Sequence, residues 1–239
     1  MKLMLGLLLW SAPAFGNNPP FQPGEKLFYS VSWFVIPAGD AGLEVGKVGM
    51  KNGIPCYHFS AWAKSTLLFF FKVNDVVESY ATTETLKSAQ FEKHIREGNY
   101  AKDQIIPFDL DNSTAKYKDG SFPVGAGCRD ALAAFYYFRM MPLPEPGGAV
   151  TICSHTDKKN YPLMIKVLKR EKLKVAAGEF NTVLIKVMPQ PGFEGLFRTK
   201  GDFWIWLTDD HWRVPVQMKV SVPIIGSVKT ELVKMELAR

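Results

Sequence analysis

The chain contains very little cysteine and no long hydrophobic run, and both shortages restrict what it can be. Its 239 residues include 3 cysteines, too few for a small domain held together by disulfides. No stretch approaches the roughly 20 apolar residues that cross a bilayer as a helix. None of the cysteines lies near the N-terminus, where a lipid anchor would need one. We therefore expect neither a transmembrane segment nor a lipid anchor.

Sequence signatures of catalysis and metal binding are also missing. The chain has no Gly-x-Ser-x-Gly elbow, no phosphate-binding glycine loop and no dinucleotide-binding fingerprint. Its four histidines, His58, His94, His155 and His211, lack the close spacing of metal-ligand sets. We therefore predict no catalytic residue, no metal and no cofactor.

Two close pairs of carboxylates are the best candidates for acid–base chemistry. Asp109 and Asp111 flank one expected turn, and Asp209 and Asp210 lie in another. Such pairs can act as general acid and base when burial separates their pKa values. Beside turn residues, aspartates more often cap backbone N–H groups. A hydrolase of cell-wall or polysaccharide substrates therefore stays as one alternative function.

The charge of the chain is moderately basic. Lysine and arginine number 29 against 23 acidic residues, a net charge of +6. The tightest basic cluster consists of Lys166, Lys169, Arg170, Lys172 and Lys174. It could face anionic headgroups or polysaccharide, or it could be the solvated face of two strands. No nucleic-acid-binding module is recognisable, so we expect no nucleic-acid partner.

The first sixteen residues have the order of segments found in a secretory signal peptide. Lys2 is followed by an apolar run over residues 3–10 and by small residues that end at Gly16. We predict cleavage near Gly16 and a single mature domain over residues 17–239. This predicts an exported protein, which is periplasmic if the source has two membranes.

An oxidising compartment also favours a disulfide. Cys128 and Cys153 are the preferred pair because they bracket one expected helix and the Pro/Gly-rich segment after it. Closing a loop of about 25 residues contributes about 3 kcal/mol in the chain-entropy model. Cys56 lies in an apolar strand pattern, so we expect a small buried side chain there.

Alternating apolar and polar residues dominate the rest of the sequence and predict an all-antiparallel sheet, curved or closed. Turns are expected at 37–40, at Asn52–Gly53, at 119–120, at 209–210 and at 223–226. The expected strands are 25–34, 41–50, 54–64, 73–82, 88–97, 100–109, 113–118, 160–174 with a break near Arg170, 182–188, 201–207, 213–222 and 226–237.

One segment, residues 130–141, breaks the strand pattern and predicts a helix. Asp130 is a good N-cap, Arg139 lies favourably near the C-terminus, and Pro142 ends the segment. The helix is apolar on nearly all sides. It must therefore be covered by a curved sheet or face a ligand, which makes the expected fold a half-open β-barrel around a helix.

Several motifs resemble one known family. They are the segments 21–33, 38–43, 130–139, 177–182 and 204–215. Their order is similar to that of the exported bacterial domain-of-unknown-function family DUF3108. The resemblance implies a β-rich fold with a central helix and no assigned activity. The architecture is also similar to the LolA- and LolB-like half-barrel carriers of lipoproteins, an analogy that says little about function.

The chain has a surplus of apolar residues in loops. Residues 67–71 place large side chains on both faces of any strand, 192–197 is a glycine-bracketed loop, and 223–226 is a hairpin tip. Together with the helix, these segments could line the mouth of a cavity, or they could close an ordinary barrel core. The candidate ligand-binding residues are Phe69, Phe71, Phe135, Tyr136, Arg139, Phe193, Leu196, Phe197, Ile224 and Ile225.

The leading functional hypothesis is a non-enzymatic exported protein that holds a lipid or another apolar envelope component between sheet and helix. Lys72 and Arg139 are candidate headgroup partners, and a salt bridge to the sheet is the other role open to Arg139. The alternative is an envelope scaffold module whose apolar loops dock onto a protein partner.

Overall fold

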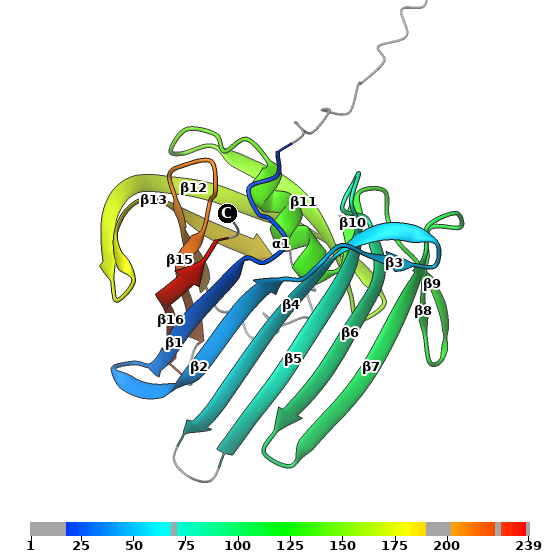
Figure 1. Ribbon diagram of the computed structural model, residues 1–239, viewed down its shortest axis with the longest axis horizontal. Coiled ribbons are helices and arrows are strands. Elements are labelled where there is room, and N and C mark those ends of the chain that lie inside the picture. The colour runs from blue at the N-terminus through cyan, green and yellow to red at the C-terminus, as the bar shows by residue number, and fades with distance from the viewer. Residues whose placement is uncertain (1–17, 68–70, 190–201, 223–225, 238–239) are drawn as a thin grey trace, which may run out of the picture.

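Most of the described chain is β-strand, wound into one strongly curved sheet around a single helix (Figure 1). The structure is a computed structural model that describes residues 18–67, 71–189, 202–222 and 226–237. The strands are β1 (Lys26–Trp33), β2 (Ile36–Val45), β3 (Gly49–Lys51), β4 (Ile54–Leu67), β5 (Phe71–Thr82), β6 (Ser88–Glu97), β7 (Tyr100–Asp109), β8 (Thr114–Tyr117), β9 (Gly120–Pro123), β10 (Cys128–Arg129), β11 (Ala149–Thr156), β12 (Lys159–Val175), β13 (Gly178–Pro189), β14 (Asp202–Thr208), β15 (Pro215–Val222) and β16 (Gly226–Glu236).

Neighbouring strands are mostly consecutive in sequence and antiparallel. The order is β10-β11-β12-β13-β14-β15-β16-β1-β2-β4-β5-β6-β7-β8-β9, with β3 beside β4. The pairing of β1 with β16 joins the start of the described chain to its end. The two-residue strand β10 differs because it runs parallel to β11. The predicted all-β class with a curved antiparallel sheet is confirmed.

Side chains connect the two ends of the sheet, between the β11–β12 hairpin and the β8–β9 hairpin. Asn160, at the start of β12, donates its side-chain N–H to the Pro123 carbonyl on β9 (3.0 Å). The backbone N–H of Lys158 donates to the Tyr117 hydroxyl (3.2 Å), and its ammonium pairs with Asp119. The curved sheet therefore has the form of a half-open barrel, and these contacts bridge its two ends, here called the seam.

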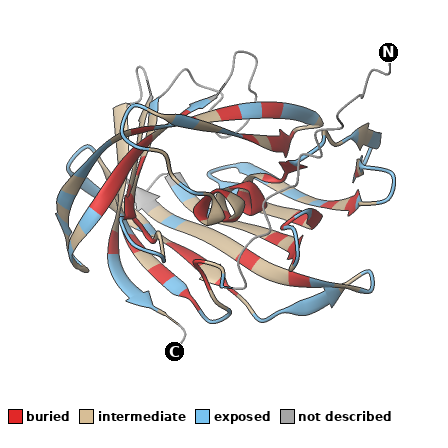
Figure 2. Cartoon of the chain, turned by 90° about the horizontal axis from the view of Figure 1, so that it is seen from above, coloured by how far each residue is buried: buried red, intermediate tan, exposed pale blue. Residues whose placement is uncertain are grey.

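The helix α1 (Ala131–Met140) lies inside the curve of the sheet (Figure 2). The Asp130 carboxylate accepts hydrogen bonds from the backbone N–H groups of Leu132 (3.0 Å) and Ala133 (2.9 Å), as an N-cap does. It also accepts from the hydroxyls of Ser79 (2.8 Å) and Ser88 (2.5 Å) on the sheet. Burial raises the pKa of Asp130, and these bonds fasten the helix N-terminus to β5 and β6.

The turn predicted at residues 37–40 is wrong, because that segment belongs to β2. The chain reverses three residues earlier, where Phe34 adopts a left-handed φ of 53°. Gly39 has a φ of 152°, and a Cβ there would lie 2.1 Å from the Lys64 carbonyl oxygen of β4. The Pro-Ala-Gly-Asp segment is therefore an irregular strand whose glycine permits close strand pairing.

The structure also differs from the expected strands in three additional short strands and in the continuity of β12. The strands β9, β10 and β11 were not predicted, because they are short or lie in the Pro/Gly-rich region after the helix. β12 is continuous where a break was expected near Arg170, and a bulge between Val167 and Lys169 takes its place. The Asn52–Gly53 turn is confirmed, with both residues at positive φ (50° and 78°).

The predicted disulfide between Cys128 and Cys153 is present. The two residues lie opposite each other in the β10–β11 pair, with Cα atoms 4.4 Å apart. The bond therefore holds the short edge strand beside β11. Cys56 is a free, buried thiol, as expected, and burial raises its pKa.

Candidate ligand-binding site

The helix end of the barrel is closed by a dense aromatic core. The rings of Phe59 and Tyr136 stack with centroids 3.8 Å apart, and Phe21 packs edge-on against both at 5.3 and 5.1 Å. All three residues are fully buried. This end of the barrel therefore leaves no space for a ligand among these residues.

A buried ion pair lies in the same end. Arg139 donates two hydrogen bonds to the Glu25 carboxylate, at 2.7 and 3.0 Å, and both side chains are almost completely inaccessible. The guanidinium also donates to the carbonyls of Pro20 (2.8 Å) and Trp212 (3.0 Å). Arg139 was a candidate either for headgroup binding or for a salt bridge to the sheet. The structure shows the ion pair, with Glu25 immediately before β1 as the partner. An anionic headgroup would have to displace Glu25 to reach it.

Toward the opposite end, the inner face of the sheet becomes less buried. On β4, Phe59 is fully buried, whereas Ala61 and Ala63, which share its face, are half-buried. On β14, Ile205 is buried and Phe203 is half-buried. The same change occurs from Leu232 to Val228 on β16, from Val216 to Val220 on β15, and from Ser79 to Val73 on β5. Apolar inward-facing side chains at this end, the open end, are therefore only partly covered by protein.

The side chains that face inward at the open end differ in kind around the barrel. On β2 and β4 they are small, including Gly39, Ala41 and Ala63. On β6 and β7 they include Lys93 and Gln104, which lie opposite each other. Burial lowers the pKa of Lys93, whose ammonium lies 3.8 Å from the Asp157 carboxylate. The inner face therefore has a small, apolar side and a polar side.

The rim of the open end carries an exposed apolar turn that is not among the predicted ligand-binding residues. Phe34, Val35 and Ile36 are 55%, 91% and 47% exposed. A Cβ on Gly226 would lie 2.2 Å from the Phe34 ring, so this glycine permits the turn to pack on the end of β16. The detectable signal was a run of four apolar residues, 33–36, at a hairpin turn.

Of the predicted ligand-binding residues, three have described side chains. Phe135 is half-buried and packs against buried residues of the core, whereas Tyr136 and Arg139 are buried at the helix end. Phe71 begins β5, on which Lys72 is exposed on the face opposite the inward-facing Val73. Phe69, Phe193, Leu196, Phe197, Ile224 and Ile225 lie outside the described residues.

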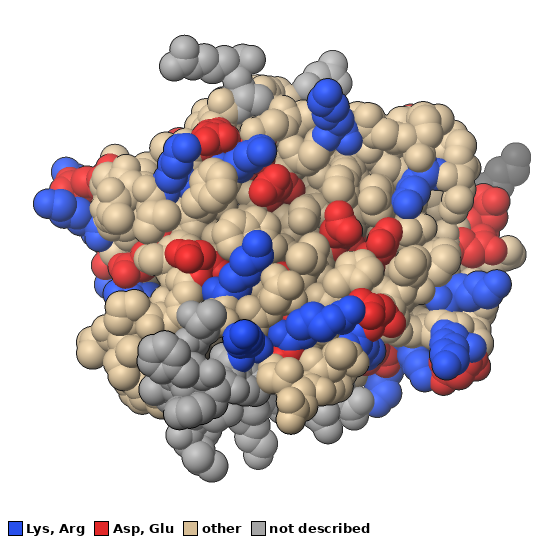
Figure 3. All heavy atoms as spheres, turned by 60° about the horizontal axis from the view of Figure 1, so that its bottom comes forward, with Lys and Arg blue, Asp and Glu red and all other residues tan. Residues whose placement is uncertain are grey.

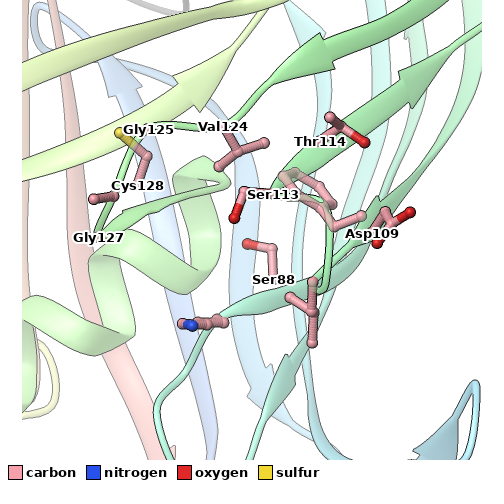
Figure 4. A pocket seen from close by; sticks show the side chains of 12 residues that line it. Ser88, Asp109, Ser113, Thr114, Val124, Gly125, Gly127 and Cys128 are labelled. Carbon is pink, nitrogen blue, oxygen red and sulfur yellow. The ribbon is translucent and has the colours of Figure 1, made fainter.

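A small pocket lies near the seam, away from the open end (Figure 4). Its volume is about 70 Å³, far below the roughly 300–1,000 Å³ of sites for drug-sized ligands. Its lining includes Ser88, Asp109, Ser113, Val124 and the disulfide-bonded Cys128. The pocket can hold water molecules but not an acyl chain.

The two carboxylate pairs lie in exposed turns. Asp109 accepts hydrogen bonds from the backbone N–H groups of Asp111 (3.1 Å) and Asn112 (2.9 Å), and the Asn112 side chain lowers its pKa. Asp210 likewise caps the N–H groups of Trp212 (2.9 Å) and Arg213 (3.1 Å). These aspartates act as turn caps, and the lowered pKa of Asp109 is the opposite of what a general acid needs.

The predicted basic cluster is solvent-exposed on both faces of β12, because the adjacent Lys169 and Arg170 point to opposite sides of the strand. Its five side chains are exposed on β12, and three of them pair with acids: Lys169 with Glu171, Arg170 with Glu145 and Asp209, and Lys172 with Glu179. On the face that includes the open end, basic and acidic side chains are interspersed (Figure 3). That face therefore carries no large area of a single charge.

Comparison with solved structures finds three similar chains, of which the first shares the fold. A β-barrel-like protein of domain of unknown function DUF1849 from Brucella abortus has a TM-score of 0.59 at 7% identity, over 91% of this chain and 99% of that chain. A protein from Parabacteroides distasonis, provisionally described as a lipoprotein, has a TM-score of 0.40 at 10% identity, over 91% and 97%. A protein from Bacteroides fragilis, provisionally described as exported with a YmcC-like fold, has a TM-score of 0.36 at 9% identity, over 91% and 98%.

Sequence comparison identifies the family. No curated protein matches the chain. Within the described residues, no helix has the length and apolar character needed to cross a membrane. The sequence model of the family described as protein of unknown function (DUF3108) matches residues 29–233, which is most of the chain. The chain therefore belongs to the DUF3108 family.

Proposed function

We propose that this protein is exported and binds a lipid, or another amphiphile with an acyl-like chain, in the open end of its barrel. The observation that carries the proposal is the change from buried to half-buried along the inner face, seen from Phe59 to Ala63 and from Ile205 to Phe203. The proposal includes cleavage of residues 1–16, a single domain over residues 17–239, and a periplasmic location in a two-membrane cell.

The chemistry of the open end matches an amphiphile. Each methylene group that moves from water onto the apolar side, beside Ala41 and Ala63, contributes about 0.8 kcal/mol. The opposite side offers Gln104, whose buried side-chain oxygen has no hydrogen-bond partner, as an acceptor for a hydroxyl or amide of the headgroup. No step of bond making or breaking is involved, so the role is that of a binding protein.

The experiment is uptake of a fluorescent fatty acid by delipidated protein. Ala63→Trp should block the inner face and weaken uptake at least tenfold. Ala101→Trp, the same change at an exposed outward position on β7, should leave uptake unchanged. Thermal melting verifies that both variants fold. Absence of uptake by folded wild-type protein, or equal uptake by both variants, would contradict the proposal.

A second candidate function, docking onto an envelope protein, is favoured by the exposed turn Phe34–Val35–Ile36. For this candidate, the wild type should co-purify with a defined envelope protein, and Val35→Asp should abolish that co-purification. Neither the wild type nor the variant should take up the fluorescent fatty acid. If Val35→Asp has no effect on co-purification, this candidate fails.

A further inference from the structure

Outside the barrel, a histidine and two glutamates converge on the outer face of β5 and β6. Glu78 lies directly opposite Glu92, and His94 follows two residues later on the same face of β6. One ligand atom from each residue lies within 4.8 Å of the others. All three side chains are partly buried, on the face of the sheet opposite the inner face that carries the ligand-binding end proposed above.

The His94 ring is oriented as in a metal-binding histidine. Its Nδ1 is hydrogen-bonded to the Asp103 carboxylate on β7 (2.9 Å), which two further bonds from Arg96 hold in place. With the proton on Nδ1, the lone pair of Nε2 faces Glu92 Oε2 at 3.6 Å. A carboxylate on the far ring nitrogen is the arrangement that fixes the tautomer of zinc-binding histidines. In the neutral ring two acceptors then face each other, and either a proton on Nε2 or a metal cation between the two atoms removes the conflict.

The two glutamates are held by separate partners. Glu92 Oε1 accepts from Gln90 (2.5 Å) and faces the Lys51 ammonium at 3.9 Å, so Oε2 is the oxygen directed toward His94. Glu78 Oε1 pairs with His58 Nε2 at 2.7 Å. Like charges directly opposite each other destabilise a strand pair. The Lys51 ammonium offsets part of this repulsion, and a divalent cation would offset more of it.

We propose that Glu78, Glu92 and His94 bind a divalent transition metal of the zinc class on the outer face of the sheet. Zinc bonds of about 2.0–2.2 Å hold tetrahedral ligand atoms about 3.3–3.6 Å apart. The Glu92–His94 distance already fits, and a small rotation of Glu78 completes the set. The imidazole favours zinc, nickel or cobalt over calcium or magnesium. Three protein ligands leave the fourth position open to water, while Asp103 and His58 act as positioning residues.

The test is zinc binding to the full mature chain after treatment with a chelator. Isothermal titration with Zn²⁺ alone should give one site per chain, and zinc should raise the melting temperature. His94→Gln, Glu78→Gln and Glu92→Gln should each weaken affinity at least tenfold. Asp103→Asn should weaken it about 10- to 100-fold through the orientation of His94. His211→Gln, at an exposed turn, is the matched control and should bind as the wild type does.

Two further measurements make the result decisive. Cobalt bound to the wild type should show a visible absorption band that His94→Gln loses, and melting in chelator should show that the variants fold like the wild type. Calcium and magnesium should not compete at equal concentration. The proposal is overturned if zinc does not bind, if the three ligand variants bind like His211→Gln, or if calcium displaces zinc.

Discussion

The buried ion pair between Glu25 and Arg139 offers the sharpest test of how this fold is held together. It links the segment before β1 to the last turn of α1, and the Arg139 bond to the Trp212 carbonyl adds the β14–β15 turn. Side-chain exposure is 0% for Arg139 and 2% for Glu25. Glu25→Gln removes the compensating charge and leaves the guanidinium buried.

The expected magnitude follows from that burial. Breaking a buried pair by removing one partner costs about 3–5 kcal/mol, because the remaining charge has no water to solvate it. Bonds to the carbonyls of Pro20 and Trp212 remain and place the expectation near the lower limit, about 3 kcal/mol. For a chain of this size, that loss lowers the melting temperature by roughly 6–12 °C. Replacing both partners, as in Glu25→Leu with Arg139→Met, should cost less than Arg139→Met alone.

Urea denaturation of the wild type, Glu25→Gln, Arg139→Met and the double variant measures their free energies of unfolding. Glu44→Gln is the control, since Glu44 forms an exposed, 3.9 Å pair with Lys26, and such pairs contribute at most about 1 kcal/mol. A loss below about 1 kcal/mol for Glu25→Gln, or no recovery in the double variant, would refute the assignment of this pair as the tie between helix and sheet.

Two further predictions concern the disulfide and the pH dependence of stability. Reducing Cys128–Cys153, or replacing both with serine, should lower the free energy of unfolding by about 3 kcal/mol, and an unchanged urea midpoint would count against it. His155 is buried, with Nδ1 bonded to Asn160 Oδ1 (2.8 Å), and burial lowers its pKa below 6.5. The unfolded chain therefore binds a proton more readily than the folded one as pH falls through 6.5, so this residue makes stability fall with decreasing pH. Denaturation at pH 7.5 and 5.5 should show a smaller fall for His155→Gln, and equal falls would exclude His155 as the cause. The hydrogen bond to Asp103 raises the pKa of His94, so His94 makes stability rise as pH decreases. This effect is the same in the wild type and in His155→Gln.

Local patterns in the sequence predicted the elements with a strong local signal. Residues 88–97 and 100–109 alternate cleanly and form β6 and β7 with those bounds. Asp130 and Pro142 delimit the helix, because capping and proline geometry act within a few residues. The segment 37–40 was misread because proline, glycine and aspartate favour turns. Its strand conformation depends on pairing with β1 and β4, which no local pattern records.

The candidate sites were less accessible to sequence reasoning. The surplus of apolar side chains was visible, but the half-buried inner face depends on where α1 fills the barrel and where it stops. The outer cluster was missed because Glu78, Glu92 and His94 have no ligand spacing along the chain. The β5–β6 register alone places Glu78 opposite Glu92.

The sequence by itself determined the β-rich class, the single inserted helix, the disulfide partners and the DUF3108 resemblance. These follow from periodicity, capping, cysteine position and motif order, all of which are properties of neighbouring residues. Only the tertiary structure decided that Arg139 pairs with Glu25, 114 residues away, and that one end of the barrel is packed while the other is half-covered. Those features depend on strand register and curvature, which bring distant residues together and determine how far water reaches each side chain.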